Sequence, residues 1–82
     1  MAKQRLDETM KPGSWVETEL YGPAVLIKIV GDFVYFRYEA IRMIDGKTIW
    51  VLNGAPLRDV KLTAPLDDVS QKVLAMKGPY GV

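Results

Sequence analysis

Glycine and proline recur along this chain at intervals that leave room only for short segments of regular structure. They stand at positions 12–13, 22–23, 31, 46, 54 and 56, several of them beside aspartate or asparagine. Both residue types interrupt regular structure, so these positions divide the first three quarters of the chain into pieces shorter than most helices. Short segments separated by regular turn signals are typical of a small all-β domain.

The segments between the turns carry strand patterns. Apolar alternation or β-branched runs predict strands over residues 15–20, 24–30, 33–41 and 47–53, with 61–63 as a closing strand. Asp45-Gly46 is the strongest hairpin signal, because this turn needs a positive φ that glycine adopts without steric cost. Residues 56–60 are too short for a strand and suit a single 3₁₀ turn. We expect residues 53–56 to end the fourth strand.

The ends of the chain differ from its middle. Leu66, Val69, Val73 and Met76 are three or four residues apart, which predicts a helical stripe. Thr63 is a plausible N-cap for that helix. The chain therefore divides into a flexible or helical N-terminal arm (1–11), a β domain (12–63), and a C-terminal helix with its tail (64–82).

Three stretches resemble a known class of fold. "KPGSWV" (11–16) resembles the opening strand of small SH3-like domains, and "YGPAVLIKIVGDFVYFRY" (21–38) resembles strands two and three of Tudor and Agenet domains. "APLRDVKL" (55–62) resembles the turn before their last strand. Residues 36–60 are also similar to the small barrel protein of photosystem I, to ferredoxin-docking barrels and to small phage-encoded barrels. The resemblance implies a mainly β protein: a five-stranded SH3-like (Tudor-like) barrel with a short C-terminal α-helix.

The resemblance to Tudor domains also implies a set of binding residues. Tudor domains bind methylated lysine or arginine in an aromatic cage. Matched to this sequence, the cage residues are Trp15, Tyr21 and Tyr38, and Trp50 is a further candidate near the rim. SH3-like folds carry many unrelated functions, so the likeness supports a methylated-peptide reader only as one alternative.

Alternation assigns the strand residues to two faces. The residues expected to face the core are Val16, Leu20, Val25, Ile27, Ile29, Val34, Phe36, Tyr38, Ile49 and Val51. Those expected to face outward include Trp15, Leu26, Val30, Phe33, Tyr35, Arg37 and Trp50. So many outward large apolar residues are unusual in a small monomer. They either pack against the chain's own termini, or form a face between identical copies, or line a groove for another partner.

The interaction hypothesis follows from that outward set. We expect a protein partner or self-association, with Trp15, Tyr21, Tyr35, Arg37 and Trp50 in the contact together with the hairpin over residues 40–47. The alternative is a nucleic-acid surface built from Lys28, Arg37, Arg42, Lys47 and Arg58. Aromatic rings beside arginine could stack with bases there. The net charge of +1 gives that alternative little general electrostatic support.

Composition excludes most chemistry. The chain has no cysteine and no histidine, so the commonest bases, nucleophiles and zinc ligands are missing. No phosphate-binding glycine motif is present. We therefore expect no enzyme activity, no metal and no cofactor. No apolar run approaches the roughly 18 residues of a membrane span, so a soluble cytoplasmic protein without membrane contact is expected.

Overall fold

The computed structural model describes residues 11–78. Its strands are β1 (Trp15–Thr18), β2 (Gly22–Val30), β3 (Phe33–Ile41), β4 (Thr48–Pro56) and β5 (Val60–Ala64). A 3₁₀ turn, η1 (Leu57–Asp59), precedes β5, and the helix α2 (Asp68–Leu74) follows it. The predicted mainly β fold with a short C-terminal helix is confirmed. The predicted arm over 1–11 lies outside the described residues apart from Lys11, and so does the end of the predicted tail.

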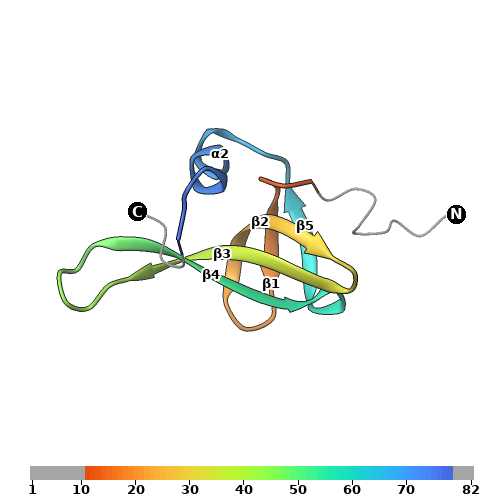
Figure 1. The fold of residues 1–82 in the computed structure, drawn as a ribbon, viewed down its shortest axis with the longest axis horizontal. Coiled ribbons are helices and arrows are strands. Elements are labelled where there is room, and N and C mark those ends of the chain that lie inside the picture. The colour runs from red at the N-terminus through yellow and green to blue at the C-terminus, as the bar shows by residue number, and fades with distance from the viewer. Residues whose placement is uncertain (1–10, 79–82) are drawn as a thin grey trace, which may run out of the picture.

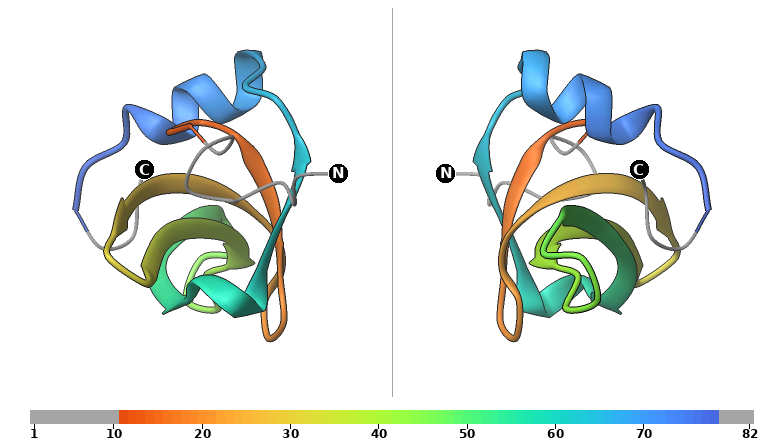
Figure 2. Two further views of the ribbon diagram at one scale, coloured as in Figure 1. Left: turned by 90° about the vertical axis from the view of Figure 1, so that its right-hand side faces the viewer. Right: turned by 90° about the vertical axis from the view of Figure 1, so that its left-hand side faces the viewer.

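All five strands belong to one antiparallel sheet with the order β4-β3-β2-β1-β5. The sheet coils strongly around its inner face, and α2 lies across its outer side (Figures 1 and 2). The 3₁₀ turn before β5 was predicted from its length and is confirmed. This arrangement is consistent with a small SH3-like β domain.

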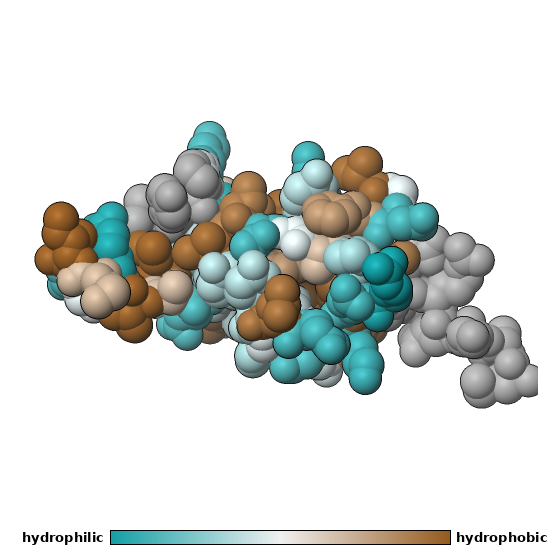
Figure 3. Space-filling view, turned by 90° about the horizontal axis from the view of Figure 1, so that it is seen from below, coloured by the Kyte–Doolittle hydropathy of each residue, from teal (hydrophilic) through white to brown (hydrophobic). Residues whose placement is uncertain are grey.

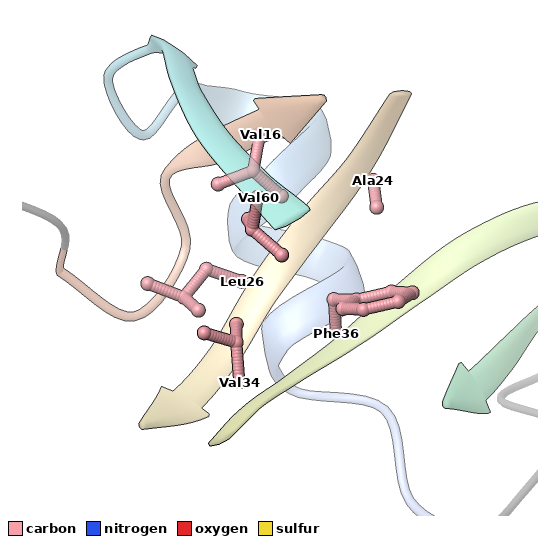
Figure 4. Packing of buried hydrophobic residues seen from close by; sticks show 6 residues of the cluster. All are labelled: Val16, Ala24, Leu26, Val34, Phe36 and Val60. Carbon is pink, nitrogen blue, oxygen red and sulfur yellow. The ribbon is translucent and has the colours of Figure 1, made fainter. Parts of the chain in front are cut away.

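The inner face of the sheet forms the hydrophobic core (Figure 4). Its fully buried members come from four strands, and they are Val16, Ala24, Leu26, Val34, Phe36 and Val60. Tyr21, Ile29 and Tyr38 pack against the edge of this cluster. The predicted inward positions Val16, Val34 and Phe36 are confirmed.

Leu26 was predicted to face outward and that prediction is wrong, because β2 contains a bulge. Leu26 pairs with Phe36, but the next pair along the ladder is Lys28 with Tyr35, so Ile27 is an extra residue. A bulge places one unpaired residue in a strand and reverses the alternation beyond it. Before the bulge, Leu26 therefore faces the core, and Val25, which was predicted to face the core, faces outward. After the bulge, Lys28 faces outward as predicted.

Leu20 was predicted to face the core and is instead 82% exposed. Strand β1 ends two residues earlier, at Thr18. The buried Thr18 hydroxyl accepts a hydrogen bond from the Tyr21 amide at 3.0 Å and donates to the Gly22 carbonyl at 3.0 Å. This local bonding forms a turn, as threonine hydroxyls commonly do, and carries Leu20 away from the sheet.

The predicted end of β4 at residues 53–56 is also wrong, since these residues continue the strand to Pro56. Gly54 pairs with Tyr35, and the Phe33 ring lies over it: a Cβ at Gly54 would be 2.4 Å from Phe33 Cε2. Glycine in a strand often marks such a close approach. The same residue type that suggests a turn is here required within the sheet.

The helix begins later than predicted. Its N-cap is Asp67 and not Thr63, which lies in β5. The Asp67 carboxylate accepts from the Ser70 amide, and the Ser70 hydroxyl is bonded to the Asp67 amide, each at 2.8 Å. This reciprocal pair is a capping box. Ser70 and Val73 form the buried face, so the predicted stripe is only partly correct: Leu66 and Val69 are exposed.

Candidate interaction surface

Part of the outer face of the sheet is covered by the chain's own C-terminal segment. Val25 on this face is fully buried, and α2 packs against β2. The Trp15 and Trp50 rings meet edge to face with centroids 6.2 Å apart. The Trp15 indole Nε1 donates to Asp67 Oδ2 at 2.8 Å, which connects the sheet to the start of the helix. Both tryptophans, expected in a partner contact, are thus half-buried in contacts within the molecule.

Arg37 lies on the same outer face and is 4% exposed. Its Nη1 donates to the Trp50 carbonyl at 2.9 Å, and its Nη2 donates to the carbonyls of Gly78 at 2.6 Å and Met76 at 3.4 Å. Burial lowers the pKa of the Arg37 guanidinium. The sequence placed Arg37 on the correct face, but this side chain anchors the segment after α2 and is not presented to a partner.

The β3–β4 hairpin extends beyond the rest of the sheet. Strand β3 pairs with β2 only between Phe33 and Tyr38, whereas its pairing with β4 continues to Ile41 and Thr48. Figure 1 shows this end as a two-stranded ribbon pointing away from the other strands. We call residues 41–48 the hairpin tip. Its turn contains Gly46 at φ +70°, as the Asp45-Gly46 signal predicted.

Local hydrogen bonds hold the hairpin tip in shape. Arg42 Nε donates to Asp45 Oδ1 at 3.1 Å, and its Nη2 pairs with Asp45 Oδ2. The amide of Arg42 donates to the Lys47 carbonyl at 2.8 Å, and the amide of Gly46 to the Arg42 carbonyl at 2.7 Å. The hydrogen bond from Arg42 lowers the pKa of Asp45 and raises that of Arg42. The tip is therefore a structured turn.

The hairpin tip exposes large apolar side chains. Ile41 is 62% exposed, Met43 96% and Ile44 89%. In the space-filling view, hydrophobic residues gather at the end of the molecule where the hairpin projects (Figure 3). Large apolar residues grouped at a projecting, ordered turn are a feature of interaction sites.

An open groove of about 300 Å³ lies at the other end of β4. Its walls are the β1–β2 turn on one side and the end of β4 with Asp59 of η1 on the other. The lining comprises residues 18–21, 54–56 and Asp59. The wall is mainly apolar, with the carboxylates of Glu19 and Asp59 beside it. An adjoining hollow shares Thr18, Glu19 and Asp59 with the groove and is also lined by Glu17, Arg58 and Lys61.

The predicted cage residues separate into two groups. Tyr21 and Tyr38 stack with centroids 4.4 Å apart and planes 16° from parallel, and the Tyr21 hydroxyl accepts from Asn53 Nδ2 at 3.0 Å. Trp15 lies on the other face of the sheet and pairs with Trp50. Stacked rings at this separation leave no gap for a ligand between them.

Tyr35 belongs to a third aromatic group, near the β2–β3 turn. The Phe33 and Tyr35 rings meet edge to face with centroids 5.3 Å apart, and Lys28 Nζ lies 5.2 Å from the Tyr35 ring centroid. A cation at this distance from a ring face is attracted to it. The predicted outward direction of Phe33 and Tyr35 is correct, and Tyr35 is half-buried.

The basic residues predicted for nucleic acid are spread over several surfaces. Lys28 lies beside Tyr35, Arg58 is on η1, and Arg42 and Lys47 are at the hairpin tip. Arg37 is buried. The structure brings only Arg42 and Lys47 together, and Arg42 is paired with Asp45.

Within residues 11–78, no three carboxylates converge in a way that could hold a metal ion. No helix in the same range has the length and apolar character needed to cross a membrane.

Sequence reasoning included the hairpin over 40–47 in the interaction hypothesis but missed its most exposed side chains, Met43 and Ile44. It also missed Leu20 in the groove. A signal was present: Ile41, Met43 and Ile44 directly precede Asp45-Gly46, so apolar residues fall where a turn is expected. Exposed apolar residues at a turn break the usual binary pattern.

Comparison with known proteins found no relative. No family model matches the chain, and no curated protein or solved structure matches it significantly.

Proposed function

We propose that this protein is a non-catalytic binding module that contacts a protein partner through the hairpin tip. The observation that carries the proposal is the exposure of Met43 and Ile44 at an ordered turn that projects beyond the sheet. The proposal keeps the hairpin named in the sequence hypothesis and moves the centre of the contact away from the outward aromatic residues.

The covered outer face supports that shift. Trp15 and Trp50 contact each other, Trp15 is bonded to Asp67, and Arg37 is bonded to backbone carbonyls of the same chain. A partner would have to displace the segment after α2 to reach Arg37, and the two half-buried tryptophans present only part of their surface. The hairpin tip requires no such displacement.

The energetics favour burial of the tip. Transfer of one fully exposed Met or Ile side chain out of water contributes about 1.5–3 kcal/mol. The Arg42–Asp45 pair and the backbone bonds already order the turn, so little conformational entropy is lost on binding. A preorganised apolar projection is suited to insertion into a pocket of a partner.

Site-specific photo-crosslinking tests this proposal. A photoreactive amino acid substituted for Met43 is expected to give a protein adduct in the cell of origin, whereas the same amino acid substituted for Val69 is not. Val69 is a matched control because it is also an exposed apolar residue, but on α2. Equal adduct yields at both positions, or none at position 43, would refute a tip-specific protein contact.

The nucleic-acid alternative gives a different result in the same experiment. It predicts nucleotide adducts that disappear as salt rises, because phosphate contacts release counterions. A protein contact made mainly by apolar side chains depends weakly on salt.

A further inference from the structure

The hairpin tip and the groove lie at opposite ends of one strand. The tip ends where β4 begins, at Thr48, and the groove is lined by residues 54–56 at the end of β4. Eight residue steps in a strand span about 26 Å. The tip of a molecule therefore cannot reach its own groove, but it can reach the groove of another molecule.

The two surfaces match in apolar character. Met43 and Ile44 project from the tip, and the groove presents Leu20, Tyr21 and Pro56 in a space of about 300 Å³. Leu20 is 82% exposed, so both partners of this contact carry an apolar side chain with no cover in the single molecule. Contact between them would remove both from water.

The two surfaces also match in charge. The Arg42–Asp45 pair neutralises itself, which leaves the tip positive through Lys47. The groove carries Glu19 and Asp59, which also line an adjoining hollow with Glu17, Arg58 and Lys61, so three carboxylates face two cations there. An acidic rim facing a basic turn favours one orientation of docking.

We propose that the partner is a second copy of this chain, whose groove receives Met43 and Ile44 of the first copy with Lys47 beside Glu19. This inference rests on the proposed function, since it names the partner of the same hairpin tip. The contact joins two different surfaces, so it is heterologous. Each added copy keeps one free tip and one free groove, and the assembly grows into a chain or closes into a ring.

The test combines two variants that each remove one surface. Met43→Ser/Ile44→Ser removes the apolar tip, and Glu19→Lys/Leu20→Ser alters the groove at exposed loop positions. The contact is small, so the natural protein should be studied by light scattering over a concentration series up to about 1 mM. Its average molar mass is expected to rise with concentration, while each variant alone stays monomeric.

An equimolar mixture of the two variants gives the decisive result. The intact tip of the groove variant can enter the intact groove of the tip variant, and no other productive contact remains. The mixture should therefore form a one-to-one dimer and nothing larger. Circular dichroism and thermal unfolding establish that both variants are folded, and Val69→Ser serves as the control that retains self-association.

Other outcomes overturn the inference in distinguishable ways. A mixture that stays monomeric while the natural protein associates would show that tips contact tips or that another surface is used. A natural protein that is monomeric at every concentration would exclude the second copy as partner. In that case, crosslinks from position 43 to a different protein would still support the proposed function, and their absence would refute both.

Discussion

The two ends of the β3–β4 hairpin have the same backbone pairing but opposite surroundings. Near Phe36 and Asn53, β3 also pairs with β2, Phe36 is fully buried on the inner face, and Arg37 is buried on the outer face. From the Glu39–Trp50 pair to the tip, β3 and β4 pair only with each other. The apolar side chains at the tip are exposed.

The difference shows that burial in this fold depends on a further strand, β2, beside the β3–β4 pair, and not on the pairing of β3 with β4 alone. A two-stranded ribbon has no inner face to close, whereas a coiled sheet of five strands does. The five-stranded part of the sheet, which we call the sheet body, therefore provides most of the folding stability. The hairpin tip remains available for binding. Four substitutions test this division, beginning with the largest expected effect on stability.

Phe36→Ala should give the largest loss, about 3–5 kcal/mol in the free energy of unfolding, because Phe36 is fully buried in the core cluster. Chemical denaturation monitored by circular dichroism measures it. A loss below about 1 kcal/mol in the free energy of unfolding would mean that the core of the sheet body is not the main source of stability.

Gly54→Ala should cost about 1–3 kcal/mol, since the new methyl group would overlap the Phe33 ring. The double variant Gly54→Ala/Phe33→Leu separates this clash from a general intolerance of alanine in β4. It should be more stable than Gly54→Ala alone. Equal stability of the single and double variants would contradict the role assigned to Phe33.

Asp67→Asn should destabilise the molecule moderately at neutral pH and much less in acid. Hydrogen bonds from the Ser70 amide, and then from the Trp15 indole, lower the pKa of the Asp67 carboxyl. The charged carboxylate therefore stabilises the fold above its unfolded pKa of about 3.9, and this contribution is lost as the pH falls through the lower folded pKa.

The stability difference between the natural protein and Asp67→Asn can be measured by thermal unfolding of both proteins between about pH 7 and pH 2.5. Asparagine is a suitable replacement because it can still cap a helix. A gap between the two melting temperatures that widens in acid would show that Asp67 does not act as a charged cap.

Met43→Ser/Ile44→Ser should change the free energy of unfolding by no more than about 0.5 kcal/mol, because both side chains are exposed. Denaturation under the conditions used for Phe36→Ala provides the comparison. A loss above about 1.5 kcal/mol would mean that the tip contributes to the fold, and would remove the contrast between the two ends of the hairpin.

Much of the fold could be predicted from local signals. Gly46 marks the hairpin turn, the short segment after Pro56 forms η1, and β3 has its predicted bounds. The errors arise where tertiary contacts override local preference. The bulge at Ile27 is invisible in an apolar run, and Gly54 suggests a turn until its neighbour Phe33 is known.

The candidate site was less predictable, because it depends on what covers each face. Alternation placed Trp15, Arg37 and Trp50 outward correctly, but no local pattern shows that α2 and the following residues lie over them. Exposure of Met43 and Ile44 depends on how far β2 extends beside β3. A pattern within one segment carries no information about such a distance.

The anchoring of Met76 and Gly78 by Arg37 implies an order of assembly. The Arg37 guanidinium can leave water only when its carbonyl acceptors on both sides are in place. One is the Trp50 carbonyl in β4, and the others are the carbonyls of Met76 and Gly78 after α2. The strands must therefore associate while Arg37 is still hydrated, and its dehydration is a late step in folding. The same bonds are expected to open first in the native state, so amide exchange should be fastest after α2 and slowest in β2 and β3.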